Sequence, residues 1–306
     1  MKIISLLPSA TEIVYALGLG DSLEAVTFEC DHPAEVRTKP VVSNTALPQD
    51  RPMTPAEVDR RVREFMEGGQ PIYALDRDLI RRIQPDLILA QDLCRVCAVP
   101  SGHVEDALQD LGCRSEVISL DPGTVDDILD GIRVVGRATG TEARAEDVAA
   151  GMRERVERVR RRAAGLPSIR TLALEWSDPP FAGGHWVPGM VQTAGGRNLL
   201  SETGRPAPRV TWEQVSAAAP EVVVFMPCGY YLAEAETEAA SLYALPAFAE
   251  TPAARGGDVF VVDATSYFSR PGPRVVDGLE ILAWAIHPDA FPDPGPDRIV
   301  RLPRPG

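Results

Sequence analysis

The sequence predicts an α/β protein of two lobes, each with a mostly parallel sheet flanked by helices, joined by one long rigid α-helix. Short apolar runs alternate with helical segments, the alternation restarts after residue 167, and a highly charged helix separates the two series. Such alternation is typical of a parallel sheet covered on both faces. We expect an N-terminal α/β lobe over 1–138, a connecting helix over 139–166, a C-terminal α/β lobe over 167–287 and a proline-rich tail over 288–306.

The connecting helix is predicted over Glu142–Ala164. Thr139 and Glu142 have the spacing of a capping box, and Gly165 with Pro167 ends the pattern. Acidic residues near the start and Arg160–Arg162 near the end complement the helix dipole. Its apolar stripe is thin, which favours a surface position and a joining role over a place inside a core. A rigid connector of this kind predicts a small hinge motion.

Each half of the chain is expected to hold its own strands and helices. In the first half, strands are predicted at Lys2–Leu7, Leu23–Phe28, Leu87–Ala90 and Val117–Leu120, and helices at Glu12–Leu17 (after a capping box at Ser9), Pro55–Met66, Asp78–Ile83, Val104–Leu111 and Val125–Val135. In the second half, strands are predicted at Thr171–Trp176, Val222–Met226 and Val259–Val262, and helices at Val187–Ala194, after the capping residue Thr211, at Leu242–Glu250 and at Arg274–Ile286. The segments 79–90 and 212–225 share the order helix, proline, acid and buried strand, which favours two similar lobes.

Composition and charge exclude several classes of protein. The 306 residues are 44% hydrophobic and 25% charged, with a net charge of −13. This negative charge disfavours nucleic acids and anionic membranes as partners, and no apolar run reaches the roughly 18 residues of a membrane span. The first residues lack a signal-peptide pattern, and five cysteines fit a reducing compartment. We expect a cytoplasmic monomer, or a periplasmic or extracellular one if a leader has been removed.

Aromatic residues gather in the window 175–231. They are Trp176, Phe181, Trp186, Trp212, Phe225, Tyr230 and Tyr231. Prolines and paired glycines in 175–186 predict a loop after a strand, the place where open α/β sheets bind ligands. Rings on a loop suit a large, flat, partly apolar ligand, whereas the alternative is that they cover the lobe's own core. A second such loop, 265–274, carries Tyr267, Phe268 and Arg270.

Six stretches together resemble a known family. They are KIISLLPSATEIVYALGLGD (2–21), FECDHP (28–33), LIRRIQPDLILAQDLCRVCAV (79–99), EWSDPPFAGGHWVPGMVQTAGGRNLL (175–200), VTWEQVSAAAPEVVVF (210–225) and YFSRPGPR (267–274). This combination resembles the cobalamin (vitamin B12)-binding branch of the ABC-transporter substrate-binding proteins, which have two α/β lobes and a single connecting helix. The resemblance covers about residues 1–287, and its motifs are more specific for the superfamily than for a corrinoid ligand.

The resemblance implies a binding site in the cleft between the lobes. In the family the ligand lies flat there, and the matching positions are Pro8, Ser9, Gln91, Asp92, Leu93, Cys94 and Cys97 in the first lobe, and Trp176, Phe181, His185, Trp186, Trp212, Tyr267, Phe268 and Arg270 in the second. In exported members, one acid on each lobe meets arginines of the transporter's membrane subunits. Asp78 and Glu213 match these acids, although Asp78 stands where the family usually has glutamate and both also suit simple helix starts.

The chain departs from the family by showing neither an export signal nor a lipid-attachment cysteine near its start. Either the leader is absent from this sequence, or the protein acts inside the cell as a corrinoid carrier, store or sensor. The odd number of cysteines favours the second reading. Expected partners are the corrinoid and the membrane subunits of an ABC transporter. No cofactor and no resident metal are expected.

Other chemistry is carried by few residues. Cys94 and Cys97 form a C-x-x-C that could be redox-active, half of a zinc site with Cys30, His32 or His103, or a thiolate source for cobalt. Glu29, Cys30 and Asp31 follow a strand and are candidates for contacts to corrin amides, or plain turn residues. His185 is the best candidate for contact with cobalt or an amide.

Catalytic interpretations have weaker support. No phosphate-binding glycine loop is present, and a hydrolase using Glu175, Asp178 and His185 lacks a recognisable nucleophile with its base. The leading hypothesis is therefore non-catalytic corrinoid binding. An iron-siderophore or haem-binding protein ranks second, because only Arg95 and Arg270 are obvious cations at the site. An intracellular thiol- or metal-dependent enzyme using Cys94 and Cys97 is the alternative of another class.

Overall fold

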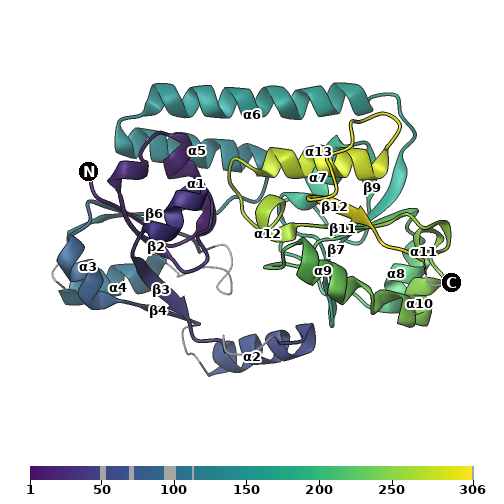
Figure 1. Ribbon diagram of the computed structural model, residues 1–306, viewed down its shortest axis with the longest axis horizontal. Helices are drawn as coiled ribbons and strands as arrows, with labels where there is room; N and C mark the ends of the chain where they lie inside the picture. Colours follow the sequence, from purple (N-terminus) through teal and green to yellow (C-terminus); the bar gives the residue numbers. More distant parts are fainter. Residues whose placement is uncertain (49–52, 69–71, 93–100, 112–113, 305–306) are drawn as a thin grey trace. The chain divides into compact units, whose positions relative to one another are not determined.

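The computed structural model describes residues 1–48, 53–68, 72–92, 101–111 and 114–304 (Figure 1). The chain forms two compact units. Unit 1 comprises residues 1–121 and 129–150, and unit 2 comprises 122–128 and 151–306. Within the described residues each unit has one six-stranded, mostly parallel sheet with flanking helices, which confirms the predicted α/β class with two sheets.

The sheet of unit 1 has the strand order β4-β3-β2-β1-β5-β6. Its strands are β1 (Ile3–Ser5), β2 (Leu23–Thr27), β3 (Val41–Thr45), β4 (Tyr73–Leu75), β5 (Leu87–Ala90) and β6 (Glu116–Ser119). All neighbours pair in parallel except β3 and β4, which are antiparallel. The helices that begin in this unit's part of the chain are α1 (Pro8–Ala16), α2 (Pro55–Glu67), α3 (Arg77–Ile83), α4 (Ser101–Leu111) and α6 (Glu142–Ala163), with short 3₁₀ turns at Gly20–Ser22 and Ala34–Thr38.

Helix α1 begins earlier than the sequence pattern predicts. Pro8 is its first residue and Leu7 its N-cap, with no side-chain hydrogen bond at the cap. The predicted capping box at Ser9 and Glu12 is therefore wrong. Proline suits the first helical position because its missing N–H would have no partner there and its φ is already helical. The helix consequently starts three residues after β1 and brings Pro8 and Ser9 to the end of that strand.

The chain leaves the sheet of unit 1 between β3 and β4 and returns to the same place. Thr45 pairs with Tyr73, and the Ala46 N–H donates to the Ile72 carbonyl at 2.7 Å. Helix α2 lies within this excursion and has a complete capping box, in which Thr54 and Glu57 bond to each other's backbone N–H. Neither β3 nor β4 is predicted from the sequence, because their residues lie in a turn-rich stretch with little alternation.

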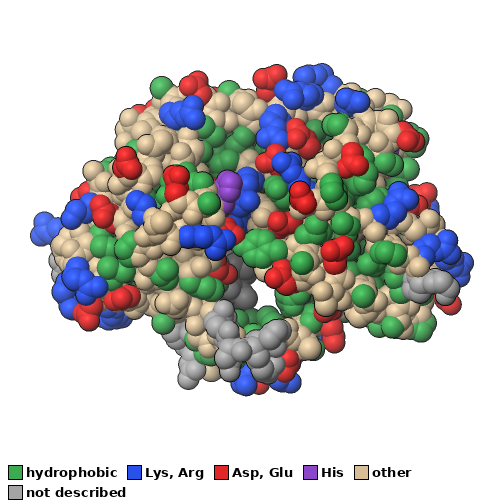
Figure 2. Space-filling model, viewed as in Figure 1, with side chains coloured by type: hydrophobic (Ala, Val, Ile, Leu, Met, Phe, Trp, Pro, Cys, Tyr) green, Lys and Arg blue, Asp and Glu red, His purple; other side chains and the backbone are tan. Residues whose placement is uncertain are grey.

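Two helices have residues in both units. They are α5 (Val125–Thr139) and α6, which is continuous over its 22 residues as predicted. Arg133 of α5 donates to both carboxylate oxygens of Glu146 of α6, at 2.7 and 3.0 Å. Thr139 ends α5 and donates to the Val135 carbonyl, so it is not the predicted capping residue of α6. Figure 2 shows basic side chains over the C-terminal part of α6, where Arg160–Arg162 occupy the last turn.

The sheet of unit 2 has the order β12-β11-β10-β7-β8, with β9 also paired to β7. Its strands are β7 (Ile169–Ser177), β8 (Pro180–Ala182), β9 (Gly196–Asn198), β10 (Val222–Phe225), β11 (Val259–Val262) and β12 (Ile299–Arg301). Strands β7, β10 and β11 are parallel to one another, whereas β8 and β12 are antiparallel to their neighbours. The helices are α7 (Val187–Thr193), α8 (Trp212–Ala218), α9 (Leu232–Ala239), α10 (Pro246–Ala249), α11 (Pro252–Gly256), α12 (Ala264–Tyr267) and α13 (Val275–Ile286), with a 3₁₀ turn at Leu242–Ala244.

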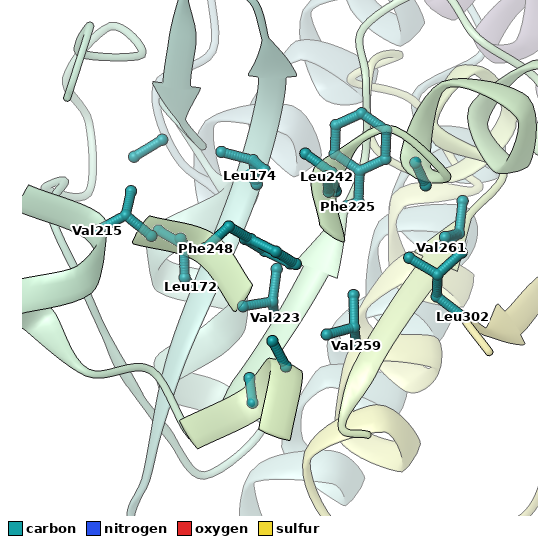
Figure 3. Packing of buried hydrophobic residues seen from close by; sticks show 14 of the residues in the cluster. Leu172, Leu174, Val215, Val223, Phe225, Leu242, Phe248, Val259, Val261 and Leu302 are labelled. Carbon is teal, nitrogen blue, oxygen red and sulfur yellow. The ribbon is translucent and has the colours of Figure 1, made fainter. Parts of the chain in front are cut away.

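One core cluster of unit 2 lies between its sheet and helices α8 to α11 (Figure 3). Apolar residues at alternate positions of β7, β10 and β11 point into it, and Leu242 and Phe248 cover them from the other side. The predicted helix over Leu242–Glu250 is in fact two short pieces, because Pro246 starts a new helix. The predicted capping box of Thr211 and Gln214 is confirmed at the start of α8.

The residues after 287 return to the sheet. Residues 299–301, expected in a proline-rich tail, form β12 and pair with β11. Within the described part of the chain, no helix is both long and apolar enough to cross a bilayer.

In each unit, the parallel strands of the sheet all end at the same edge. We call this the carboxyl edge.

Candidate functional site

Most of the predicted binding residues of unit 1 lie at its carboxyl edge. Strands β2, β1 and β5 are adjacent and parallel, so their ends meet. The residues that follow these ends are Pro8 and Ser9 after β1, Glu29, Cys30 and Asp31 after β2, and Gln91 and Asp92 after β5. Ends of parallel strands are where open α/β sheets bind ligands. The sequence pattern therefore brings three separate segments to one place.

A one-way chain of hydrogen bonds ties the segment after β2 to helix α1. Ser5 Oγ donates to the Leu7 carbonyl at 2.9 Å, Thr11 Oγ1 donates to Ser5 Oγ at 2.8 Å, and Cys30 Sγ lies 3.1 Å from Thr11 Oγ1. A hydroxyl has one proton to donate, and that of Thr11 is used by Ser5. With that proton given to Ser5, the thiol is the donor in the contact between Cys30 and Thr11. Cys30 is buried, and this contact ties the segment after β2 to helix α1.

The start of the segment after β5 is fixed against the end of β6. Gln91 Nε2 donates to the Leu120 carbonyl at 3.0 Å, and the Asp92 N–H donates to Asp121 Oδ1 at 2.6 Å. Ser119 Oγ also donates to Asp92 Oδ2 at 3.0 Å. The predicted site residues Leu93, Cys94 and Cys97 lie outside the described residues, so their roles stay predictions. Across the described ranges, no three His, Cys, Asp or Glu side chains gather as a metal site.

In unit 2 the predicted aromatic loop is held between β7 and the segment 203–210. The Gly184 N–H donates to Glu175 Oε2 at 3.0 Å, the His185 N–H donates to the Arg205 carbonyl at 2.6 Å, and the Gly204 N–H donates to the His185 carbonyl at 2.9 Å. Gly184 has no room for a side chain, since a Cβ there would lie 2.2 Å from the backbone nitrogen of Ala207. The paired glycines thus allow two backbone segments to meet.

Two of the aromatic residues predicted to contact the ligand have buried side chains. Trp186 is 6% exposed and Phe268 is 3% exposed. Trp186 Nε1 donates to the Phe268 carbonyl at 3.0 Å, which joins the loop before α7 to the end of α12. A buried indole N–H needs such a partner. This bond joins the two predicted aromatic loops, and the contact of either ring with a ligand stays a prediction.

Other rings stand at the ends of the strands. Trp176, near the end of β7, meets Tyr230 edge to face, with 5.5 Å between ring centroids. Phe181 is half-buried on β8 and pairs across from Trp176. Arg270 is only 6% exposed, and its Nη2 donates to the Tyr231 hydroxyl at 3.4 Å. The predicted site does not include Tyr230, Tyr231 or the half-buried Cys228. All three come shortly after the apolar run of β10, and this position is a signal from which they could have been predicted.

His185 has the features of a functional residue. Its φ is 51°, a left-handed conformation that residues other than glycine seldom adopt, and such strain gathers at binding and active sites. Burial lowers the pKa of its imidazole, which is therefore neutral at pH 7. Within the described structure, its buried Nε2 has no hydrogen-bond partner. A neutral imidazole can accept a hydrogen bond or ligate a metal, which agrees with the predicted role but does not select between them.

Replacing Glu175 with glutamine is expected to remove a pH dependence from stability. Burial raises the pKa of the Glu175 carboxyl, and the bond from the Gly184 N–H lowers it by less. The folded state therefore holds this proton more tightly than the unfolded state. The resulting stabilisation is complete below the usual pKa and is lost as the pH rises through the raised pKa. The wild-type free energy of unfolding should fall over that range, and Glu175→Gln should not show this fall.

Urea unfolding between about pH 4 and pH 8 measures this difference. Exposed Glu202 provides the control, because Glu202→Gln should keep the wild-type profile. Parallel curves for wild type and Glu175→Gln would show that the carboxyl makes no such contribution.

The remaining predicted residues lie apart from these contacts. The half-buried ring of Trp212 packs against the unit 2 core, edge to face with Phe248 at 6.0 Å between centroids. Asp78 is exposed in the first turn of α3 and pairs with Arg81 at 2.7 Å. Glu213 is exposed in the first turn of α8, where backbone and Thr211 hydrogen bonds lower its pKa. Both acids are exposed at helix starts, which fits docking and ordinary helix starts alike, so their docking role stays a prediction.

The family model described as periplasmic binding protein matches residues 3–265. The chain belongs to this family. A vitamin B12-binding protein of Vibrio cholerae is 27% identical over 284 residues, covering 91% of this chain and 86% of that protein. An uncharacterized ABC transporter substrate-binding lipoprotein of Bacillus subtilis is 23% identical, covering 95% of this chain and 81% of that protein. The predicted resemblance is confirmed.

Solved structures of this family share the fold. The periplasmic vitamin B12-binding protein of Vibrio cholerae has a TM-score of 0.67 and 25% identity, covering 93% of this chain and 96% of that one. A periplasmic haem-binding protein of Pseudomonas aeruginosa has a TM-score of 0.75 and 22% identity, covering 100% and 99%, a likeness of fold alone. Because these relatives are named as periplasmic proteins or lipoproteins, the predicted cytoplasmic location is not supported.

Proposed function

We propose that this protein binds cobalamin or a related corrinoid without catalysing a reaction, and delivers it to an ABC transporter. The observation that carries the proposal is the 27% identity over 91% of the chain to a vitamin B12-binding protein. The half-buried rings at the carboxyl edge of unit 2 support it, because a corrin offers broad apolar faces that aromatic side chains cover well. Amide groups at the corrin rim would suit Glu29, Asp31 and Gln91 of unit 1.

We infer from the names of its relatives that the protein works outside the cytoplasmic membrane, in the periplasm or tethered to the cell surface. Exposed Asp78 and Glu213 are proposed to meet arginines of the transporter's membrane subunits. No further cofactor is proposed beyond the bound corrinoid, and the protein is proposed to act as a monomer.

Gel filtration of the protein with cyanocobalamin tests the main proposal. At concentrations on the order of tens of micromolar, corrin absorbance should elute with the protein in about equal molar amount. Serum albumin at the same concentration controls for unspecific carriage. Protein that elutes without corrin colour would overturn the proposal.

A haem or ferric siderophore is the second candidate, favoured by a specific observation. A further guanidinium group, that of Arg274, lies beside Tyr267, with its Cζ 5.9 Å from the ring centroid. Cations suit the carboxylates of haem or the negative charge of a ferric siderophore. The same gel filtration with haem, followed by competition with cyanocobalamin, decides between the two ligands.

A further inference from the structure

Two arginines lie beside the ring of Tyr267. It is the last residue of α12, the helix that follows the carboxyl end of β11, and it is half-buried. The Cζ atom of Arg298 lies 5.5 Å from the centroid of its ring, and that of Arg274 lies 5.9 Å away. A guanidinium over an aromatic face is attracted by the electron-rich ring. Of the two, Arg298 comes from the part of the chain for which the sequence predicts a proline-rich tail.

Arg298 is itself fixed by its backbone. Its N–H donates to the Gly295 carbonyl at 3.2 Å, and its carbonyl accepts from the Asp263 N–H at 3.1 Å. Asp263 is the N-cap of α12, where its Oδ1 accepts from the Ser266 N–H at 2.8 Å. The segment before β12 and the helix that carries Tyr267 are therefore joined at the start of that helix.

The side chain of Arg298 belongs to a charged network. Its Nη1 lies 3.9 Å from Asp277 Oδ1 of α13. The same Asp277 oxygen accepts from Arg155 of α6 at 2.8 Å, and Arg155 also donates to Glu280 at 3.0 and 2.6 Å. Arg298 and Arg155 thus share the Asp277 carboxylate. The guanidinium beside Tyr267 is thereby joined to α13 through Asp277 and to α6 through Arg155.

We propose that Arg298 is a positioning residue for the ligand: it fixes the ring of Tyr267 at the carboxyl edge of unit 2 and does not touch the ligand itself. The proposal rests on the proposed function, in which Tyr267 contacts the bound molecule. Both residues lie beyond the stretch matched by the family model, which ends at residue 265. On this proposal, the segment after residue 287 contributes to the binding site by positioning the ring of Tyr267.

The phenol of Tyr267 gives a readout that is independent of ligand binding. Burial raises its pKa, nearby Arg298 and Arg274 lower it, and Asp263 and Asp277 raise it. Removing the Arg298 charge should therefore raise the pKa of Tyr267 further. Alkaline titration of phenolate absorbance, taken as the difference from the Tyr267→Phe variant, isolates this one ring. A general loss of packing would instead expose the ring and move its pKa back toward the usual value.

The chain offers a matched control. Arg301 lies three residues later in β12, and its Cζ is 5.1 Å from the ring of Phe260, a buried residue within the sheet. It also has an acidic neighbour, Asp258, at 3.4 Å. Arg301→Gln therefore removes the same kind of contact three residues further along the chain without touching Tyr267.

The experiment compares Arg298→Gln, Arg298→Lys and Arg301→Gln, using titration with cyanocobalamin and with haem. Arg298→Gln should weaken binding of the ligand that wild type takes by roughly five- to tenfold, with a raised Tyr267 pKa. Arg298→Lys, which keeps the cation, should restore most of the affinity, and Arg301→Gln should bind like wild type. Equal affinity in wild type and Arg298→Gln, or an equal loss in Arg301→Gln, would overturn the proposal. If wild type takes neither ligand, the proposed function fails, and an unchanged Tyr267 titration in Arg298→Gln would still refute the positioning role.

Discussion

Replacing Gly184 with alanine is expected to lower the free energy of unfolding of unit 2 by about 3 kcal/mol. The added Cβ would lie 2.2 Å from the Ala207 nitrogen and 2.7 Å from its Cα, and both atoms are backbone. Since neither can rotate away, one of the two segments must shift. The shift would also lengthen the bond from the Gly184 N–H to Glu175 and displace His185 and Trp186. Urea unfolding and cyanocobalamin titration of the variant measure the two consequences.

Gly151→Ala is the control for this prediction, because it makes the same chemical change where there is space. Gly151 lies within α6, is exposed, and has no neighbouring atom within 4 Å of the position that a Cβ would take. Alanine should stabilise that helix by about 0.5–1 kcal/mol, since glycine loses more backbone entropy on folding. A Gly184→Ala protein as stable as Gly151→Ala would show that the loop and the segment 203–210 are not tightly packed.

Truncating Phe248 to alanine is expected to cost about 3–5 kcal/mol, the largest effect we expect from a single substitution in unit 2. Its side chain is 0% exposed and lies at the centre of the core cluster, between the sheet and the short helices (Figure 3). Two rings meet it edge to face, Trp212 at 6.0 Å and Tyr243 at 5.7 Å between centroids. Losing the ring leaves a cavity and removes both contacts. Thermal and urea unfolding measure the loss.

Two further variants serve as controls for the Phe248→Ala prediction. Phe248→Leu fills most of the space and should cost less than about 1.5 kcal/mol. Met66→Ala removes an apolar side chain that is 46% exposed on α2 and should change stability by less than about 0.5 kcal/mol. Tryptophan fluorescence adds a local readout, because Trp212 should shift to longer wavelength in Phe248→Ala only. An unshifted spectrum together with a small stability loss would show that the core closes around the missing ring.

The sequence predicted the central strands of both sheets, and with them part of the site. The apolar runs of β1, β5, β7, β10 and β11 are buried from both faces and bounded by turn residues, so their pattern is strong. Whatever follows such a strand lies at its carboxyl edge, and this rule alone places Pro8, Gln91 and Trp176. Strand β1 is also short but lies within the longer apolar run 3–7, whereas β4, β8, β9 and β12 have three residues each and no such run around them. Their positions depend on the neighbours they pair with.

Tertiary packing determines which aromatic side chains of unit 2 are buried and which are exposed. Trp186 stands just before α7 and Phe268 just after α12, and both rings are buried. The Trp186 indole N–H donates to the Phe268 carbonyl and so joins the two segments. No sequence pattern records that distant contact. Arg298 is a similar case, since its neighbour Tyr267 is 31 positions earlier in the chain and is reached only because β12 folds back along β11.

The excursion between β3 and β4 is closed at its base by the pair Thr45 and Tyr73 and by the bond from Ala46 to Ile72. Beyond that base, Leu47 and the α2 residues Val62 and Phe65 also pack against the unit 1 core. Loop closure itself is a small term, since doubling a loop costs only about 0.6 kcal/mol. A change of length in this excursion is therefore expected to be tolerated where it leaves both the base and these apolar contacts in place, and to destabilise unit 1 where it removes them.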